Sequence, residues 1–453
     1  MPPRTAKRCD ADLLLSPAGP RGPFRVTWRA RVTARPPSRR AVLRGAAAGA
    51  ALAAGTASGC GFSRGSGDGL VFGFHGDSIA IDTYQQVAEL YQRRNPGARV
   101  RCTYADSLGF FQRLPLMFRA GTAPDVVIVA ESWVSGLSQL GGYADLTRFL
   151  ERDGLGEDTW VPGALTPARI EGQTLCLPCL VYPKGIAYNR TLLREAGMPD
   201  PRPGWREAQF VETAAAVAHG SGAGRVWGLH NGFGTAQPWD VPTIHGSLPF
   251  DPYERRMTAT DPRVVSSLQL LADLVHEHDA MPGAAQEQDT VNFTSGRFGL
   301  ALFAGYFLTA WTEQIGSRFD WGVVPFPAEW SGTYQNNNAA VFEGSRRKEE
   351  AFAFARFLST DPEAQEMLAP LGTPALRETA GTWQRGLPAA AAEYPWPELI
   401  QQMEDQLVAY QGGVFNKIWD VLGGAVQAVE NTGKPVGQAL HEVQERGTEI
   451  LRA

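Results

Sequence analysis

Two clusters of polar and aromatic side chains stand directly after stretches that the sequence predicts to be buried strands. His75, Asp77 and Ser78 follow the first stretch, and Glu131 and Trp133 follow another. Carboxylates, hydroxyls and imidazoles exchange hydrogen bonds with the polar groups of a ligand, and an indole packs against its apolar surface. The competing interpretation is that the polar residues cap following helices and that the tryptophan packs in a core.

Cys176 and Cys179 have the C-x-x-C spacing of redox centres and of one half of many zinc sites. The sequence contains no second Cys or His pair at metal-ligand spacing to accompany them, and His276 and His278 look like the exposed end of a helix. The pattern therefore favours structural cysteines, with no metal and no cofactor.

Three consecutive amides, Asn336, Asn337 and Asn338, precede a predicted strand. Such a run is poorly suited to a core, and we expect it near a crossing between two domains. A ligand-binding or hinge role for Asn337 competes there with a simple turn.

The segments that carry these residues alternate between strand-like and helix-like patterns. Apolar runs predict strands at 70–74 and 125–129, and a further strand is expected at 98–104. An amphipathic pattern predicts a helix at 83–94, and a second helix is expected around 110–120. This alternation is typical of a parallel α/β sheet. Ligands of such sheets bind at the carboxyl ends of strands, where both polar clusters are expected.

The rest of the chain mixes shorter strands with helices. We expect further strands at 174–177, 185–188, 298–303, 319–325 and 339–342. Helices are expected at 191–196, 205–219, 263–278, 348–358, 362–368, 396–410, 414–431 and 436–451.

Length and composition indicate a globular protein with two domains. The chain has 453 residues, of which 43% are hydrophobic and 20% charged, and its formal net charge is −5. The part after Cys60 is too long for one core, and no stretch of it is apolar enough to span a bilayer. A basic stripe of the kind that binds nucleic acid is missing from the sequence.

Residues 38–60 have the pattern of an export signal. Ser38-Arg39-Arg40 precedes an Ala- and Gly-rich run that ends in Ser58-Gly59-Cys60. The pattern resembles the twin-arginine signal of bacterial lipoproteins, although Val42 and Ala57 replace the commoner Phe and Leu. This resemblance implies lipidation at Cys60. We interpret 1–37 as a start site placed too far upstream or as a disordered extension, and 61–69 as a linker.

Several further motifs recur in one order along the chain. They are Asn95-Pro96-Gly97, Gly121-Thr122-Ala123-Pro124-Asp125, Tyr188-Asn189-Arg190-Thr191-Leu192-Leu193, Phe293-Thr294-Ser295-Gly296-Arg297, Gly305-Tyr306 and the segment 351–361. In this order they resemble the family 1 extracellular solute-binding proteins of ABC importers, the group that includes maltose-binding protein. The resemblance implies an α/β fold of the periplasmic-binding-protein type II, with two lobes, a hinge and a ligand cleft between them.

The lobes expected from this resemblance are discontinuous. The first would contain 70–180 and about 336–375, and the second about 184–330 and 395–453. The resemblance also implies cleft aromatic residues that stack on sugar rings, namely Trp239, Tyr306, Phe307, Phe415 and Trp419. Core packing is the alternative fate of each.

The function that the resemblance implies is that of a monomeric receptor. It would bind a mono- or oligosaccharide, close its lobes on it, and deliver it to the membrane permease of an ABC transporter. The lipid on Cys60 would hold it at the outer face of the cytoplasmic membrane.

Two other functions stay open at this point. A receptor for a non-sugar solute, such as a polyol phosphate or a peptide, would line its cleft with Arg or Lys. A secreted polysaccharide hydrolase would need two carboxylates at glycosidase separation, for which Asp77 and Glu131 are the available pair. The sequence contains no G-x-S-x-G, H-E-x-x-H or P-loop motif, so we do not expect an enzyme.

Overall fold

The computed structural model describes residues 69–230, 240–252, 254–283, 286, 292–384, 387, 389–410 and 414–452. The expected signal at 38–60, including Cys60, and the candidate Trp239 lie outside these ranges. Within them, no helix combines the length and the apolar character that a membrane crossing requires.

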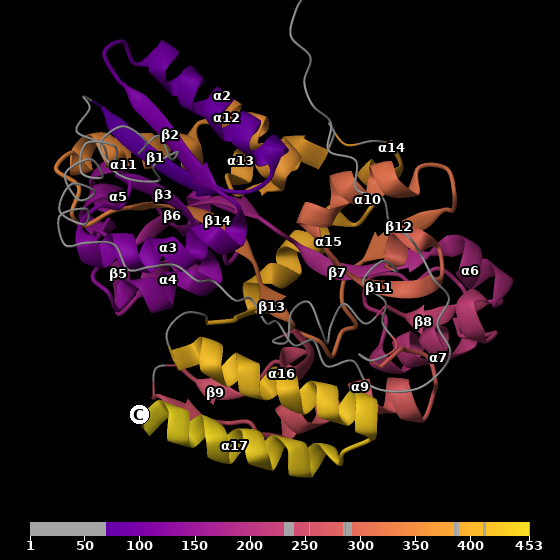
Figure 1. Ribbon diagram of the computed structural model, residues 1–453. Helices are drawn as coiled ribbons and strands as arrows, with labels where there is room; N and C mark the ends of the chain where they lie inside the picture. Colours follow the sequence, from indigo (N-terminus) through magenta and orange to yellow (C-terminus); the bar gives the residue numbers. More distant parts are fainter. Residues whose placement is uncertain are drawn as a thin grey trace, which may run out of the picture. The chain divides into compact units, whose positions relative to one another are not determined.

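A six-stranded sheet forms the core of the first lobe (Figure 1). β1 pairs in parallel with β2 and β3, and β14 pairs antiparallel with β3 and β6. The strands, in their order across the sheet, are β15 (Thr373–Pro374), β6 (Cys176–Val181), β14 (Asn336–Val341), β3 (Val126–Ala130), β1 (Leu70–His75) and β2 (Val100–Ala105). The carboxyl ends of β1, β2, β3 and β6 therefore share one edge with the amino ends of β14 and β15.

Helices that follow the parallel strands begin at this edge. Asp77 caps α2 (Ser78–Arg94) by accepting a hydrogen bond from Ala80 N–H at 3.0 Å. Asp106 caps α3 (Ser107–Ala120) by accepting one from Gly109 N–H at 2.9 Å. Each cap satisfies a backbone N–H that lacks a partner within its helix. The helix expected to begin at 83 thus begins one turn earlier, behind its aspartate cap.

A four-stranded mixed sheet forms the second lobe. Its order is β12 (Trp321–Val324), β7 (Lys184–Asn189), β11 (Phe298–Ala304) and β8 (Trp227–Leu229). β7 runs antiparallel to both β12 and β11, and β11 runs parallel to β8. The helices α6 (Arg190–Glu195), α7 (Glu207–Val217) and α10 (Leu308–Ile315) contact this sheet or the turns beside it.

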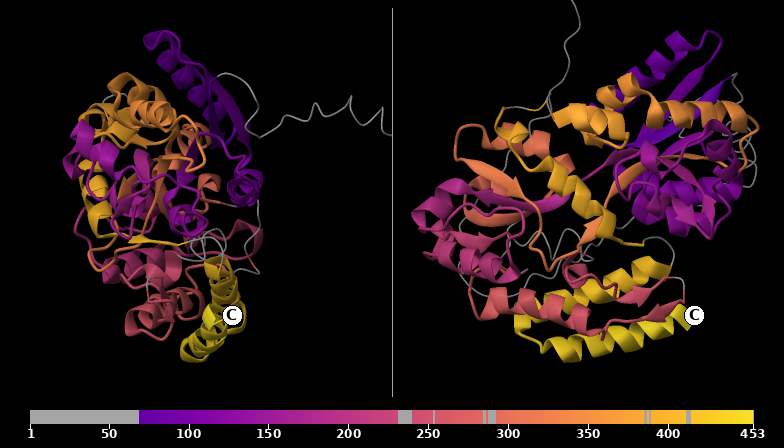
Figure 2. Two further views of the ribbon diagram at one scale, coloured as in Figure 1. Left: turned by 90° about the vertical axis from the view of Figure 1, so that its left-hand side faces the viewer. Right: turned by 180° about the vertical axis from the view of Figure 1, so that it is seen from behind.

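Three helices at the far side of the second lobe pack on one another. They are α9 (Pro262–His276), α16 (Val414–Thr432) and α17 (Val436–Arg452), and α16 and α17 lie side by side in every view (Figure 2). Their buried faces contribute leucines and valines to one continuous core cluster.

The chain crosses between the two sheets from β6 to β7 and again from β12 to β14. Lys184, the first residue of β7, is fully buried. Its Nζ donates to Oδ1 of Asp240 at 2.7 Å and to Oγ1 of Thr333 at 2.6 Å. Thr333 lies on the second crossing, in β13 (Thr333–Tyr334), and Asp240 begins α8 (Asp240–Thr243). Lys184 therefore joins the first crossing to α8 by a buried ion pair and to the second crossing by a hydrogen bond.

A third segment is held against these crossings by an amide. The Gln402 side chain donates to the Lys184 carbonyl and accepts from Phe326 N–H at 3.1 Å. The helix expected at 396–410 ends accordingly at α15 (Trp396–Gln401), and the chain continues into β16 (Leu407–Val408), which pairs with β13. The single helix was a wrong prediction, because these tertiary contacts override the helical pattern of the sequence.

The amide run is also placed differently from a turn. Asn336, Asn337 and Asn338 are the first residues of β14, and Asn336 and Asn338 are fully buried. Asn336 donates to the Ala164 carbonyl at 3.0 Å, and Asn338 donates to the side-chain oxygen of Asn336 at 2.7 Å. A core tolerates these amides because their donors are hydrogen-bonded.

Candidate functional site

A pocket of about 910 Å³ opens at the shared strand edge of the first sheet. Its volume lies in the upper part of the range of about 300–1,000 Å³ that ligand pockets occupy. It can therefore hold a ligand of more than one ring. The lining residues are His75, Gly76, Asp77, Ile79, Ala80, Tyr84, Asp106, Ser107, Phe111, Ala130, Glu131, Ser132, Trp133, Tyr182, Tyr306, Thr309, Ala310, Glu313, Gln335, Asn336, Asn337, Pro370 and Leu371.

Residues from both lobes contribute to this lining. Most of them follow β1, β2, β3 and β6, or precede β14 and β15, at the edge where these strand ends meet. Tyr306 comes directly after β11, and Thr309, Ala310 and Glu313 lie on α10. The end of β11 pairs with the start of β7, which is the first crossing segment. The pocket thus lies beside the hinge.

Glu131 is a buried carboxylate in the wall of the pocket. It is the first residue of α4 (Glu131–Ser138) and is 5% exposed. Burial raises its pKa to about 7, although the hydrogen bond from Asn336 N–H and the charge of Lys184 oppose that shift. The Asn336 N–H donates to its Oε2 at 2.8 Å. Glu131 therefore titrates near neutral pH.

One buried polar atom of the pocket, Nε2 of His75, has no hydrogen-bond partner among the described residues. The buried hydroxyl of Tyr84 lies in the same lining, beside the Asn337 side chain. Burial lowers the pKa of His75 to about 4, so its ring is neutral at physiological pH. Because unpaired buried polar groups are costly, a ligand that hydrogen-bonds Nε2 of His75 would gain free energy from that contact.

Aromatic rings provide apolar surfaces in the same pocket. The rings of Trp133 and Phe111 are stacked, with centroids 4.7 Å apart and an interplanar angle of 12°. Tyr182 and Tyr306 meet edge to face, with centroids 5.4 Å apart. Tyr182 accepts a hydrogen bond from the Asn337 amide at 2.8 Å. Flat apolar faces beside polar groups suit ligands with both kinds of surface.

The chain matches the family model of bacterial extracellular solute-binding proteins over residues 77–365. It belongs to this family. The matched region contains every lining residue of the pocket except Gly76 and His75, which precede it, and Pro370 and Leu371, which follow it.

Individual relatives agree with this membership. A putative binding protein of Brucella abortus (strain 2308) is 23% identical over 289 residues, which cover 61% of this chain and 68% of the relative. The sugar-binding protein MalE from Xanthomonas citri has a TM-score of 0.72 at 18% identity, covering 84% of this chain and 97% of that one. An ABC substrate-binding protein from Listeria monocytogenes, solved with cycloalternan, has a TM-score of 0.70 at 18% identity and covers 84% and 98%. These likenesses confirm the two-lobed α/β fold.

The pocket of this solute-binding protein brings together six of the residues predicted from the sequence. These residues are His75, Asp77, Glu131, Trp133, Tyr306 and Asn337. Asp77 lines the pocket and also caps α2, so both competing interpretations describe it. Ligand contact by these residues stays a prediction.

Ser78 and Phe307 are not part of the pocket lining. Ser78 is the exposed first residue of α2, next to the Asp77 cap. The ring of Phe307, which directly precedes α10, stacks on Trp311 of that helix with centroids 4.7 Å apart. Phe307 therefore packs against α10 and does not line the pocket.

Phe415 and Trp419 lie in the core of the second lobe. They are 2% and 3% exposed, and both rings contact Phe250. The Trp419 indole donates to the Tyr410 carbonyl at 2.7 Å. The structure therefore corrects their expected placement in the cleft, because they belong to the buried face of an amphipathic helix.

Tyr84, Phe111, Tyr182 and Glu313 line the pocket without having been predicted from the sequence. Tyr84, Phe111 and Glu313 lie inside helices, where an aromatic or acidic residue has no local mark of function. Tyr182 follows the buried strand β6 and precedes Pro183, so the rule that sites lie at strand ends could have found it.

The cysteines are structural. Cys176 and Cys179 are fully buried free thiols in β6, and burial raises the pKa of Cys179 to about 12. A thiol held in its neutral form is a poor nucleophile. His276 is the exposed last residue of α9, as predicted, and its Nε2 lies 2.8 Å from the Val429 carbonyl oxygen. No group of metal-ligand residues occurs in the part of the chain that the structure describes.

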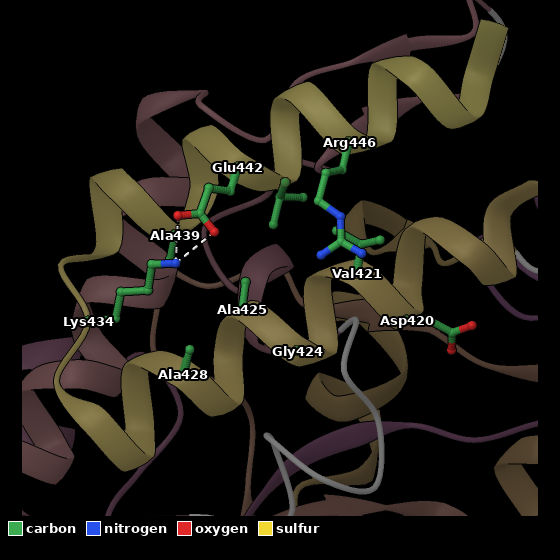
Figure 3. A pocket seen from close by; sticks show the side chains of 10 residues that line it. Asp420, Val421, Gly424, Ala425, Ala428, Lys434, Ala439, Glu442 and Arg446 are labelled. Atoms are coloured by element: carbon green, nitrogen blue, oxygen red, sulfur yellow. Dashed lines mark hydrogen bonds and ion pairs between the residues drawn. The ribbon is translucent and has the colours of Figure 1, made fainter.

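A second, smaller pocket of about 280 Å³ lies between α16 and α17 (Figure 3). Its floor consists of small residues, among them Gly424, Ala425 and Ala428. Lys434 and Glu442 point toward one another and form an ion pair at 2.7 Å. Because Lys434 and Glu442 neutralise each other, this smaller pocket is a poorer ligand site than the pocket at the strand edge.

Proposed function

We propose that this solute-binding protein is an extracytoplasmic receptor for a carbohydrate and delivers it to the membrane permease of an ABC transporter. The observation that carries the proposal is the combination of stacked aromatic faces with buried polar groups in one large pocket. A saccharide has both apolar ring faces and many hydroxyls, so it complements this combination. The ligands of its structural relatives, a sugar for MalE and cycloalternan for the Listeria protein, support the same class.

The mechanism needs binding and closure only. Because residues of both lobes line the pocket and the hinge lies beside it, a ligand that contacts both lobes would favour a closed arrangement. The closed form would be the one that the permease recognises, and no covalent step is involved.

The test is a thermal-shift screen of the purified mature protein against a carbohydrate panel, followed by calorimetry. A saccharide that binds the folded state raises its melting temperature. We expect Trp133→Ala to reduce the affinity for that saccharide about tenfold or more. Stacking of a ligand ring on an aromatic side chain contributes on the order of 1–3 kcal/mol. If no saccharide raises the melting temperature, the carbohydrate assignment fails.

The two alternative functions have less support. A receptor for phosphorylated solutes would need cationic side chains, yet the lining residues of the described pocket include no Lys or Arg. For a hydrolase, Asp77 and Glu131 follow the neighbouring strands β1 and β3 of one sheet, so they stand on one wall instead of facing each other. Replacing both and assaying hydrolysis separately from binding tests this point, because turnover that is lost on replacement would contradict the receptor function.

We also propose that Cys60 carries a lipid that keeps the monomeric receptor at the outer face of the cytoplasmic membrane. The support is the signal-like sequence at 38–60. A diacyl modification supplies the two chains that stable anchoring requires.

A further inference from the structure

We propose that the saccharide bound by this receptor carries a protonated amino group. The inference rests on the proposed carbohydrate function and specifies the charge of the ligand. Three features of the pocket support it: the sign of its charges, the engagement of Lys184 with other partners, and the buried polar groups of its lining.

Four carboxylates line the pocket, and no basic side chain lines it among the described residues. Asp77, Asp106 and Glu131 stand at the strand edge of the first lobe, and Glu313 stands on α10 of the second. None of the four forms an ion pair with a described Lys, Arg or His. Asp77 and Asp106 each use Oδ1 for a helix cap, which leaves Oδ2 for a ligand. Acidic side chains on both sides of a cleft attract a cation from either direction.

Among the described residues, the groups that act on the Glu131 carboxylate are already occupied or uncharged. Lys184, whose charge acts on Glu131, is bound to Asp240 and Thr333 on the hinge side. His75 is neutral, because burial lowers its pKa to about 4. The remaining titratable groups that interact with Glu131 are the phenols of Tyr182 and Tyr334, which burial also keeps neutral by raising their pKa. The negative charge of the pocket is therefore left for the ligand.

The buried polar groups of the lining show that the ligand has more than a charge. Nε2 of His75 has no hydrogen-bond partner among the described residues, and the Tyr84 side chain, which is 1% exposed, lies beside Asn337 in the same lining. A saccharide hydroxyl can donate to Nε2 of His75. The faces of Trp133 and Tyr306 can receive an ammonium group through its attraction to an aromatic ring. An amino sugar satisfies these contacts together, whereas a simple amine leaves Nε2 of His75 unpaired.

The proposal predicts proton release on binding. Glu131 is partly protonated near pH 7, and an ammonium group beside it favours its ionised form. Binding of an amino sugar would thus release a fraction of a proton, and binding of a neutral sugar would release none. Calorimetry in buffers of different ionisation enthalpy measures this fraction.

The decisive experiment compares saccharides that differ at one substituent. The purified mature protein is titrated with glucose, glucosamine and N-acetylglucosamine, with the galactose counterparts, and with β-1,4-linked oligomers of the glucose set. We expect the free amines to bind at least tenfold more tightly than the hydroxyl and acetamido forms at pH 7. Their affinity alone should fall as ionic strength rises from roughly 0.02 to 0.3 M, because salt screens charge.

Isosteric variants connect this preference to the carboxylates. Asp77→Asn and Asp106→Asn keep an oxygen for the helix cap, so folding is preserved while the charge is removed. We expect each of them, and Glu313→Gln, to weaken binding of the amine roughly fivefold more than binding of the neutral sugar. Glu212→Gln, on an exposed position of α7 away from the pocket, is the matched control and should change neither.

The outcomes separate the two proposals. If neutral sugars bind as tightly as their amino counterparts, or if the three pocket variants weaken both alike, the charge inference is overturned and the carbohydrate function stands. If no saccharide of any kind binds the folded protein, the carbohydrate function fails and the charge inference fails with it.

Discussion

At the scale of single residues, three carboxylates of the pocket contribute both to the fold and to the site. Asp77 and Asp106 cap helices and line the pocket, and Glu131 begins a helix while lying within 2.8 Å of the β14 backbone. Helices that start at strand ends need acceptors there, and ligands bind there too. The same carboxylates therefore support the fold and shape the site.

The raised pKa of Glu131 predicts a pH dependence of stability. Its carboxyl binds a proton up to about pH 7 in the folded state, but only up to its ordinary value of about 4.5 when unfolded. Because the folded state binds more protons between these values, stability falls as pH rises through this interval. We expect urea unfolding to show a loss on the order of 1–3 kcal/mol from pH 5 to pH 8 that Glu131→Gln removes. An unchanged pH slope in the variant would contradict the buried titration.

At the scale of elements, the sequence predicted the part of the site that follows regular strands. β1 and β3 are continuous apolar runs, so their ends could be located, and His75, Asp77, Glu131 and Trp133 with them. Phe415 and Trp419 could not be assigned in this way, because an aromatic residue on a helix has the same local pattern in a core and in a cleft. The end of α15 depends on the tertiary contacts of Gln402, which no local pattern contains.

The core position of Phe415 gives a prediction that separates packing from binding. Phe415→Ala removes a ring that stacks on Phe250 at a centroid distance of 5.1 Å. We expect it to lower the free energy of unfolding by about 3–5 kcal/mol, measured by urea titration. The affinity of the surviving folded protein for its saccharide should be unchanged.

Trp133→Ala is the matched comparison. It should show the opposite pattern, with a small change in stability and a large loss of affinity. If Phe415→Ala weakens binding as strongly as Trp133→Ala does, the core placement of α16 does not describe the solution protein.

The buried ion pair at the crossings gives a second prediction at this scale. Lys184→Met leaves the Asp240 carboxylate buried without its cation, so we expect a loss of about 3–5 kcal/mol in urea unfolding. The double variant Lys184→Met with Asp240→Leu should recover most of that loss, because it leaves no charge unpaired. A double variant as unstable as the single one would show that the pair is not a unit.

At the scale of the whole molecule, residues of the two lobes meet at one pocket beside the segments that join them. Lys184, Thr333 and Gln402 tie these segments together at the same place. Motion of the lobes about this place would open or close the pocket while each sheet stays intact.

The proposed anchor is tested on the complete protein in its own membrane. Cys60→Ser should release the receptor from the membrane fraction, as measured by fractionation and immunoblotting, because the lipid is the only attachment that we propose. The released protein should bind its saccharide with unchanged affinity. Retention of the variant in the membrane fraction would rule out Cys60 as the anchor.

The stacked pair of Trp133 and Phe111 has an energetic consequence for recognition. A ring that is already held at an interplanar angle of 12° to its neighbour has little rotamer freedom left to lose. Ordering a free side chain at an interface costs about 0.5–1.5 kcal/mol, and here that cost is incurred during folding. The pocket is thus preorganised. Part of its affinity for a ligand that stacks on Trp133 then depends on the Phe111 ring, which the ligand need not touch.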